Sequence, residues 1–343
     1  MNPTPTTAAS HWLARLEDSW HGWRRRRGLR RGLVPTVIPF AGYGNAEWVR
    51  VLGRVVLRRP GAPPVDRFTN IRGWRSFVSI PVGDREVEVV AGGERHTIRS
   101  DRGGVFDATI PVRMPRGWGS VTLRVAADEV EAPVFVVDGK IGFGVVSDVD
   151  DTVMVTALPR PLLAAWNTFV LNEHARRPVS GMAVLYTRLQ HAHPAAPFIY
   201  LSTGAWNVAP ALTRFLERNL YPRGSLLLTD WGPTHDRWFR SGPAHKAESL
   251  ERLAAEFPEV SWLLIGDDGQ HDEHIYGEFA AAHPENVSAV AIRRLTPGEA
   301  VLAGGRSEAE AHGVDGVPWV YADDGAGLIV QLEKLGLLVA DAS

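Results

Sequence analysis

The 343-residue chain contains no cysteine. A disulfide framework, a thiolate-ligated metal site and a cysteine nucleophile are therefore excluded, and any chemistry must rely on oxygen and nitrogen groups. Long apolar runs are also absent. The longest stretch without charged or histidine residues spans 194–213 and is interrupted by prolines and polar residues, so it does not predict a membrane span. Since the start of the chain lacks the apolar block of a signal peptide, we expect a cytoplasmic protein.

The chain has little net charge, but its charges are unevenly distributed. Residues 1–35 carry seven arginines and two acidic residues, which leaves a net charge of −7 on the rest of a chain whose total is −2. Apolar side chains recur there at helical spacing, at Trp12, Leu13, Leu16, Trp20 and Trp23. We therefore predict a basic amphipathic arm over 1–35 that binds an anionic membrane surface peripherally, at its inner, cytoplasmic face. Packing of the arm on the protein's own body is the main alternative. Nucleic-acid binding is a weaker one, and no nucleic-acid partner is expected.

Short alternating apolar runs fill residues 36–139. They are separated by pairs of turn-forming residues such as Pro60-Gly61, Gly92-Gly93 and Gly103-Gly104. This spacing predicts a small all-β, sandwich-like domain. No catalytic constellation lies in this segment, and its role stays open.

Buried apolar strands alternate with helical segments over residues 140–343. Strands are expected at 141–147, 197–201, 226–228, 261–265 and 287–292, and helices at 181–190, 210–219, 244–257, 275–282 and 325–338. Such alternation predicts an α/β, Rossmann-like domain with a parallel sheet.

Carboxylates follow two of the predicted strands. The first strand leads into Asp148, Asp150, Asp151 and Thr152, and a later one into Gly266-Asp267-Asp268, with Asp272 close behind. In a parallel sheet the carboxyl ends of strands form the ligand crevice. Because clustered acids require a cation and oxygen ligands suit magnesium, we predict a Mg²⁺ site there.

Two further segments supply groups that bind phosphate. Ser202 and Thr203 end another predicted strand, and Lys246 stands at the start of a helix. Carboxylate, hydroxyl, ammonium and metal together are the components of a phosphoryl-transfer site. Taken singly, the hydroxyls could also be helix caps, and the lysine could be solvated.

The order of these motifs resembles a known superfamily. Asp148-x-Asp150-x-Thr152, Ser202, Lys246 and Gly266-Asp267-Asp268 are similar to the four signature motifs of the haloacid dehalogenase superfamily. The fuller strings between 141 and 294 resemble the catalytic domain of actin-patch phosphatidate phosphatases and their bacterial relatives. Thr203 departs from the pattern, since these relatives favour an asparagine there.

The resemblance implies the catalytic roles. Asp148 would be the nucleophile that forms an aspartyl-phosphate, and Asp150 would protonate the leaving oxygen and then activate water. Thr152 would hold the loop, and Lys246 would stabilise the charge of the nucleophile and of the phosphate.

The resemblance also implies which residues bind substrate and metal. Thr152, Ser202, Thr203 and Lys246 would line the phosphate site. The implied metal-site residues are Asp148, Asp150 through its backbone carbonyl, Asp267, and Asp268 and Asp272 around them.

Motif spacing indicates how substrates reach the site. The intervals from Asp148 to Ser202 and from Ser202 to Lys246 leave no room for a large cap domain, so we expect an uncapped site that is open to a large or surface-bound substrate. Together with the basic arm, this favours a Mg²⁺-dependent phosphatase acting on phosphatidate or a related anionic phospholipid. The alternatives are a phosphatase of the same mechanism acting on another phosphomonoester, including nucleic-acid ends, and a non-catalytic module that binds membrane or cytoskeleton.

Overall fold

The computed structural model describes residues 22–61, 80–155, 177–229, 242–269, 271–302 and 316–339. Backbone contacts divide the chain into two compact units, with the main division after Val136. The first unit is Met1–Val136 with Ala205–Asn207 and Asp230–Ser241, and the second is the remainder. Each unit is described separately below. Among the described residues, no helix is both long enough and apolar enough to cross a membrane.

The first unit contains one eight-stranded sheet. Its order is β3-β2-β1-β8-β7-β4-β5, and β6 pairs with β2 off this path. The strands are β1 (Val34–Gly44), β2 (Trp48–Arg58), β3 (Ile80–Pro81), β4 (Glu86–Ala91), β5 (Glu94–Arg99), β6 (Val105–Pro111), β7 (Gly117–Val125) and β8 (Asp128–Val136). Neighbouring strands pair in antiparallel fashion, except that β1 and β8 are parallel over Gly42–Gly44.

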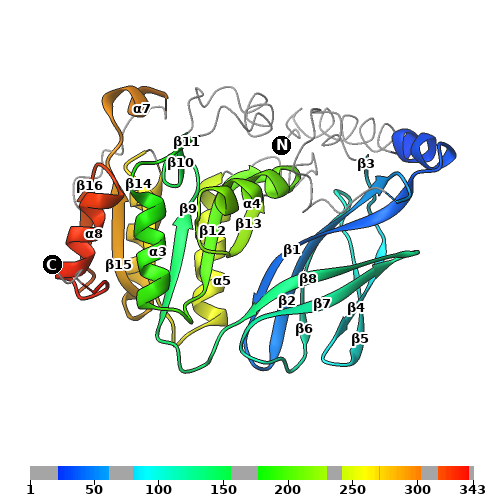
Figure 1. The fold of residues 1–343 in the computed structure, drawn as a ribbon, viewed down its shortest axis with the longest axis horizontal. Helices are drawn as coiled ribbons and strands as arrows, with labels where there is room; N and C mark the ends of the chain where they lie inside the picture. The colour runs from blue at the N-terminus through cyan, green and yellow to red at the C-terminus, as the bar shows by residue number, and fades with distance from the viewer. Residues whose placement is uncertain are drawn as a thin grey trace, which may run out of the picture. The chain divides into compact units, whose positions relative to one another are not determined.

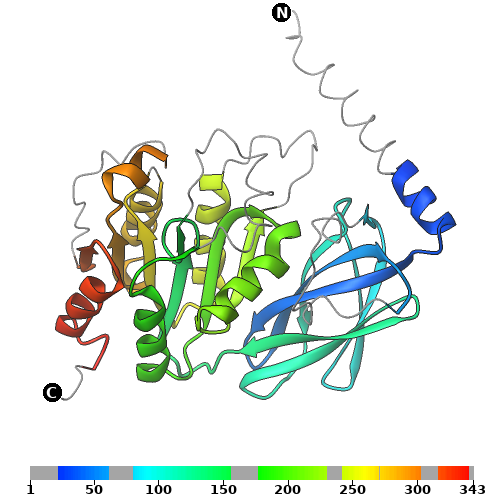
Figure 2. The ribbon, with the colours of Figure 1, turned by 45° about the horizontal axis from the view of Figure 1, so that its top comes forward.

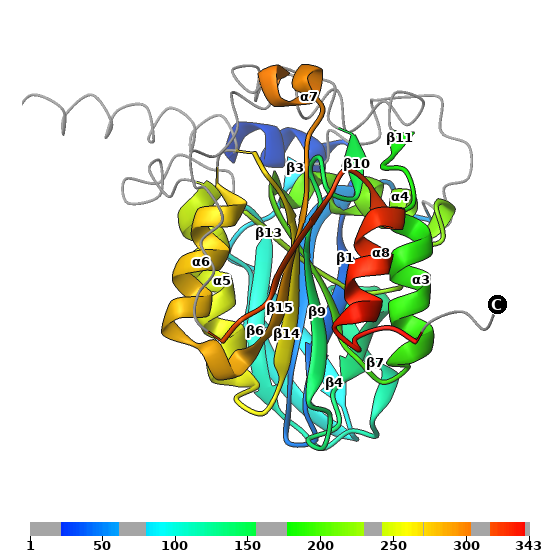
Figure 3. The same cartoon turned by 90° about the vertical axis from the view of Figure 1, so that its left-hand side faces the viewer.

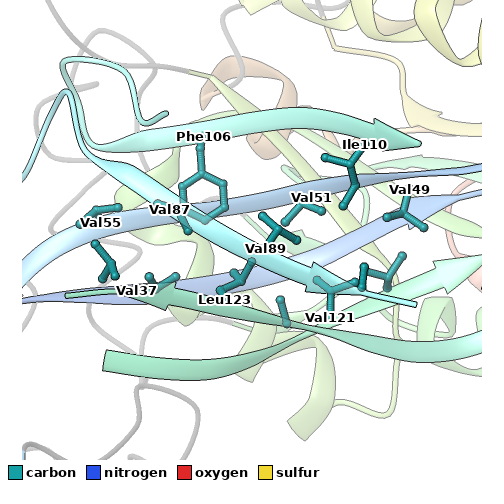
Figure 4. Close-up of a cluster of buried hydrophobic side chains, with 14 of the residues drawn as sticks. Val37, Val49, Val51, Val55, Val87, Val89, Phe106, Ile110, Val121 and Leu123 are labelled. Atoms are coloured by element: carbon teal, nitrogen blue, oxygen red, sulfur yellow. The ribbon is translucent and has the colours of Figure 1, made fainter. Parts of the chain in front are cut away.

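Alternating side chains of this sheet form one apolar core. Over the last five residues of β7 and of β8 every second residue is buried, as a strand with one covered face requires. Val51 on β2, Val89 on β4, Phe106 on β6 and Leu123 on β7 belong to the same buried cluster (Figure 4). The described strands of this unit form one continuous sheet, because β1 pairs with β2 on one side and with β8 on the other. The predicted sandwich-like domain is not confirmed.

The described part of the basic arm is a short helix. Residues 22–30 are helical and lead into β1 (Figure 2). The Arg27 guanidinium lies over the Trp23 ring, 5.3 Å from its centroid, and Trp23 and Leu29 are exposed. Trp12, Leu13, Leu16 and Trp20 lie outside the described residues, so the amphipathic prediction stays a prediction.

The second unit is built on a six-stranded sheet with the order β13-β12-β9-β14-β15-β16. Its strands are β9 (Phe143–Asp148), β12 (Phe198–Ala205), β13 (Ser225–Thr229), β14 (Ser261–Asp267), β15 (Val287–Arg293) and β16 (Trp319–Ala322). The pairs β12–β9, β9–β14, β14–β15 and β15–β16 are parallel. A separate two-stranded sheet is formed by β10 (Met154–Val155) and β11 (Arg177–Pro178), which follow β9 in the chain.

Helices cover both faces of the parallel sheet (Figures 1 and 3). Two helices, α3 (Met182–Ala192) and α8 (Gly325–Lys334), lie on one face, and α5 (Gly242–Glu256) and α6 (Asp272–Ala282) lie on the other. The remaining helices are α4 (Ala209–Arg218) and α7 (Pro297–Leu302), together with short 3-10 turns η4 (Trp206–Val208) and η5 (Pro284–Asn286). The α/β architecture expected for this part of the chain is confirmed.

Strand order places a ligand crevice at β9. From β9 the chain adds β12 and β13 on one side and then returns to add β14, β15 and β16 on the other. Such a reversal opens a crevice outside the carboxyl end of the central strand. Residues 156–176 and 230–241 lie outside the described residues, so the absence of a cap domain remains a prediction.

Candidate active site

The predicted nucleophile loop, residues 148–154, begins where β9 ends. Asp148 is the last residue of β9 and is buried, with 1% of its surface exposed. The amide of Val153 donates to the Val149 carbonyl at 3.0 Å, and that of Asp151 donates to the Met154 carbonyl at 2.8 Å. These bonds form a tight turn that brings Asp148 to the crevice.

Lys246 lies beside Asp148. It belongs to the first turns of α5 and is buried, and its Nζ donates to Asp148 Oδ1 at 2.5 Å and to Asp272 Oδ1 at 2.6 Å. One ammonium therefore joins acids from β9 and from the start of α6. Lys246 and Asp148 are therefore in contact in the structure.

Asp267 and Asp272 complete a buried acidic cluster. Oxygens of Asp148, Asp267 and Asp272 all lie within 4.8 Å of one another. The lack of a side chain at Gly266 allows this arrangement, because a Cβ there would lie only 2.7 Å from Asp272 Oδ2 and 2.7 Å from Tyr276 Cε2. We call Asp148, Asp267 and Asp272 the acid trio.

Burial and mutual repulsion control the charge of these groups. Burial raises the pKa of Asp148 well above its usual value, against the attraction of Lys246. Burial and the neighbouring Asp272 raise the pKa of Asp267 to about 8. Burial alone would lower the pKa of Lys246, but Asp148 and Asp272 raise it, so the lysine stays an ammonium. Three carboxyl groups thus share a single ammonium.

The donor set of the trio fits a hard divalent cation. All three groups offer carboxylate oxygens, and their spacing lets one ion contact each residue. Asp267 Oδ1 already accepts the Gly269 amide at 2.6 Å, and Thr152 Oγ1 donates to Asp267 Oδ2 at 3.4 Å. These bonds fix the orientation of the carboxylate, as is usual for metal ligands.

Asp150 and the hydroxyl residues form the neighbouring side of the site. Ser202 Oγ donates to Asp150 Oδ2 at 3.1 Å and accepts the Gly204 amide at 3.0 Å. The Thr203 carbonyl accepts the Thr229 hydroxyl at 2.9 Å, and its side chain packs so closely on Gly242 that a Cβ there would lie 2.4 Å from Thr203 Cγ2. The structure thus brings Ser202 to the acid, whereas these contacts direct Thr203 toward β13 and α5.

Asp268 lies in a different environment from the trio. Its Oδ1 accepts the Leu295 amide at 2.7 Å, and its own amide donates to the Arg293 carbonyl at 3.0 Å. These contacts attach Asp268 to the segment after β15. Among the described residues the acidic cluster does not include Asp268 or Asp150.

Two polar side chains near the loop were not predicted from the sequence. Tyr186 on α3 is hydrogen-bonded to Ser147, whose Oγ donates to the Asp148 carbonyl at 2.6 Å. Arg293, the last residue of β15, is buried and donates from Nη1 to the Asp151 carbonyl at 2.7 Å. An arginine ending an apolar run gives no local signal of such a contact.

Comparisons with known proteins match the segment of the chain that carries this cluster. The model of "Phosphatidate phosphatase APP1, catalytic domain" matches residues 143–294. Phosphatidate phosphatase APP1 of Saccharomyces cerevisiae is 24% identical over 153 residues, and the uncharacterized protein C29B5.04c of Schizosaccharomyces pombe is 26% identical over 153 residues. Each alignment covers 44% of this chain, and the chain spans about a quarter of the length of these curated relatives.

Solved structures are more distant. A HAD family hydrolase from Deinococcus radiodurans R1, solved with bound phosphate and sodium, shares 14% identity at a TM-score of 0.33, covering 58% of this chain and 99% of that one. This likeness is too low to support an argument about the site. The family match coincides with the segment that carries the acid trio and Lys246. The expected resemblance to the catalytic domain of the phosphatidate phosphatase APP1 family is thereby confirmed for residues 143–294.

Proposed function

We propose that the chain is a Mg²⁺-dependent phosphatidate phosphatase that hydrolyses a lipid phosphomonoester through an aspartyl-phosphate. One observation carries this proposal: Lys246 bonds the buried Asp148 at the carboxyl end of the central strand, within the acid trio. The match of residues 143–294 to a phosphatidate phosphatase catalytic domain supports it.

The first half of the reaction forms the intermediate. An oxygen of Asp148 attacks phosphorus, and the bond from phosphorus to the lipid alcohol breaks. Asp150 gives its proton to the departing oxygen. Ser202, which donates to Asp150 Oδ2 at 3.1 Å, would hold that carboxyl group in place for the proton transfer.

The second half releases phosphate. Asp150, now a carboxylate, removes a proton from water, and the water oxygen attacks phosphorus. The acyl-phosphate bond breaks, and the electron pair returns to Asp148. Both carboxyl groups are then in their starting states, with alcohol and inorganic phosphate as products.

Lys246 and the hydroxyl residues would hold the phosphoryl group. The ammonium orients the Asp148 carboxylate in the free protein and offsets phosphate charge when substrate binds. We assign Thr152 and Ser202 to loop support and phosphate contact, and Thr203 to the margin of that site. Asp268 would support the segment after β15.

Asp148, Asp267 and the Asp150 carbonyl would hold magnesium, with Asp272 beside them. When bound, the ion neutralises the clustered carboxylates and the phosphoryl oxygens. Asp272 has a second function in the structure, because its Oδ1 accepts from Lys246 while its Oδ2 accepts the Asp267 amide at 3.4 Å.

We propose a division of labour along the chain that serves a lipid substrate. The arm over 1–35 would attach the protein peripherally to an anionic membrane at the cytoplasmic face, the domain over 36–139 would have no part in the chemistry, and the domain over 140–343 would be catalytic. Each arginine near such a surface contributes about 1 kcal/mol to the free energy of membrane binding, and salt weakens this attraction.

Phosphate release from phosphatidate vesicles tests this function. We expect turnover with Mg²⁺, none after chelation and inhibition by Ca²⁺, whose looser coordination misplaces the nucleophile. Equal rates with a soluble phosphomonoester would favour the broader phosphatase, and no turnover of either substrate would contradict catalysis.

Deleting residues 1–33 should weaken activity on vesicles and spare the soluble substrate. Vesicle co-sedimentation compares the full-length and truncated proteins at low and high salt. Equal binding by the two proteins would show that the arm packs on the protein instead of on the membrane.

A further inference from the structure

A partly buried ion pair contacts the nucleophile loop from outside the motifs. Arg293 Nη2 donates to both carboxylate oxygens of Glu299, at 2.8 and 2.9 Å, while Nη1 donates to the Asp151 carbonyl. The side chains are 6% and 18% exposed. A guanidinium has a rigid, planar set of donors, so it can make both contacts at once.

The Asp151 backbone needs such support. Its φ of 57° lies in the left-handed region, which is unfavourable for a residue with a Cβ. Both backbone polar groups of Asp151 are bonded, the amide to Met154 and the carbonyl to Arg293. Because the peptide unit is planar, the bond from the amide also orients the carbonyl of Asp150.

Glu299 is held independently of Arg293. Its Oε2 accepts the Thr296 amide and the Thr296 hydroxyl, each at 2.9 Å, and its amide donates to Thr296 Oγ1 at 3.3 Å. This reciprocal pattern is a capping box at the start of α7. Burial works to raise the pKa of Glu299, but hydrogen bonds from Arg293 and Thr296 keep it below the usual value.

We propose that Arg293, oriented by Glu299, is a positioning residue for the nucleophile loop. It holds Asp151 in the left-handed conformation and thereby keeps the Asp148 and Asp150 carboxyl groups in their reactive arrangement. The inference rests on the proposed phosphatase function, since positioning is measured here by its effect on turnover. Arg293 acts through the backbone and makes no described contact with Asp148 or Asp150.

The test compares Arg293→Met, Arg293→Lys and Glu299→Gln with a matched control. The control is Arg188→Met, which removes a partly buried ion pair between Arg188 on α3 and Glu333 on α8, 2.8 Å apart. Turnover of a soluble aryl phosphate is measured with saturating Mg²⁺, together with thermal stability. Hydrogen exchange of amides 149–154 is followed in protein stripped of divalent ions.

We expect Arg293→Met to lower kcat about 10²-fold with KM nearly unchanged, since small misplacements of reacting groups have effects of that size. Arg293→Lys and Glu299→Gln should fall between this variant and wild type. Arg188→Met should lose stability without losing kcat. Exchange of the 149–154 amides should accelerate in the Arg293 variants but not in the control.

Three outcomes are decisive. A kcat within twofold of wild type in both Arg293 variants would overturn the inference, and so would unchanged exchange at 149–154. If Arg293→Met does not fold, Arg293→Lys and Glu299→Gln give the same test. Absence of turnover in the wild-type protein would instead contradict the proposed function, and the exchange comparison would still decide whether Arg293 fixes the loop.

Discussion

The two units bury different kinds of side chain. In the described part of the first unit, Ser100 is the only buried polar residue, and the core is made of valine, leucine, isoleucine, phenylalanine and alanine. The second unit buries a series of charged residues, namely Asp148, Asp151, Arg214, Lys246, Asp267, Asp268, Asp272, Glu273 and Arg293. Among the described residues, buried charge therefore gathers in the unit that carries the acid trio.

Free energies explain why this difference is informative. Burying a Val or Leu side chain stabilises a fold by about 1.5–3 kcal/mol, whereas a buried ion costs several kcal/mol unless it is well partnered. The acid trio has one described lysine between its three carboxyl groups. Such an arrangement sacrifices stability, and this is typical of functional sites.

The largest effect expected is on catalysis in the second unit. Asp148→Asn should lower turnover ~10⁴-fold or more, because an amide cannot act as the nucleophile. Phosphate release from both lipid and soluble substrates measures it. Retention of more than a few per cent of activity in pure protein would remove Asp148 from this role.

A smaller and selective effect is expected at Asp150. Asp150→Asn should slow lipid hydrolysis by about 10²–10⁴-fold, because no group then protonates the departing alcohol. An activated aryl phosphate needs little protonation and should lose less. Equal losses with both substrates would contradict the acid role.

The first unit should respond in stability rather than in chemistry. Leu123→Ala removes a fully buried side chain from the core of that unit and should destabilise it by about 2–5 kcal/mol. Thr122→Ala, at a half-buried position on the same strand, is the matched control. Denaturant unfolding measures the change, and kcat on a soluble substrate should stay within twofold. A parallel loss of kcat would break the comparison between the units.

A further effect on stability concerns pH. In protein without divalent ions, the Asp267 pKa of about 8 exceeds its unfolded value of about 3.9. The folded state therefore binds a proton more tightly, and stability should fall as the pH rises from about 4 to about 8. Thermal unfolding of Asp267→Asn should show a flatter pH profile, and the exposed Asp84→Asn should follow wild type. A wild-type profile that does not fall in this range would contradict the shift.

Local patterns predict the second unit well. Each strand expected over 141–292 is present with its bounds moved by a few residues, because buried apolar runs and turn residues mark both ends. The approach of Asp148, Lys246 and Asp267 follows from parallel strands ending at one edge. The family resemblance supplied their roles.

Long-range contacts explain what the sequence does not reveal. The pairing of β2 with β6, and of β1 with β8, joins segments far apart in the chain and leaves no local period. Asp268 follows Asp267 directly, yet its carboxylate bonds Leu295 because adjacent residues at a strand end point in different directions. Arg293 reads as the end of an apolar strand, and only the sheet order brings it to Asp151.

Trapping the covalent intermediate tests directly whether Asp148 is the nucleophile. Wild-type protein is mixed with phosphatidate and Mg²⁺ and quenched in acid during turnover, and the acyl phosphate is reduced with borohydride. We expect homoserine to replace aspartate at position 148, and Asp148→Asn to give no homoserine. Phosphate release without modification at Asp148, or with modification at another residue, would contradict it.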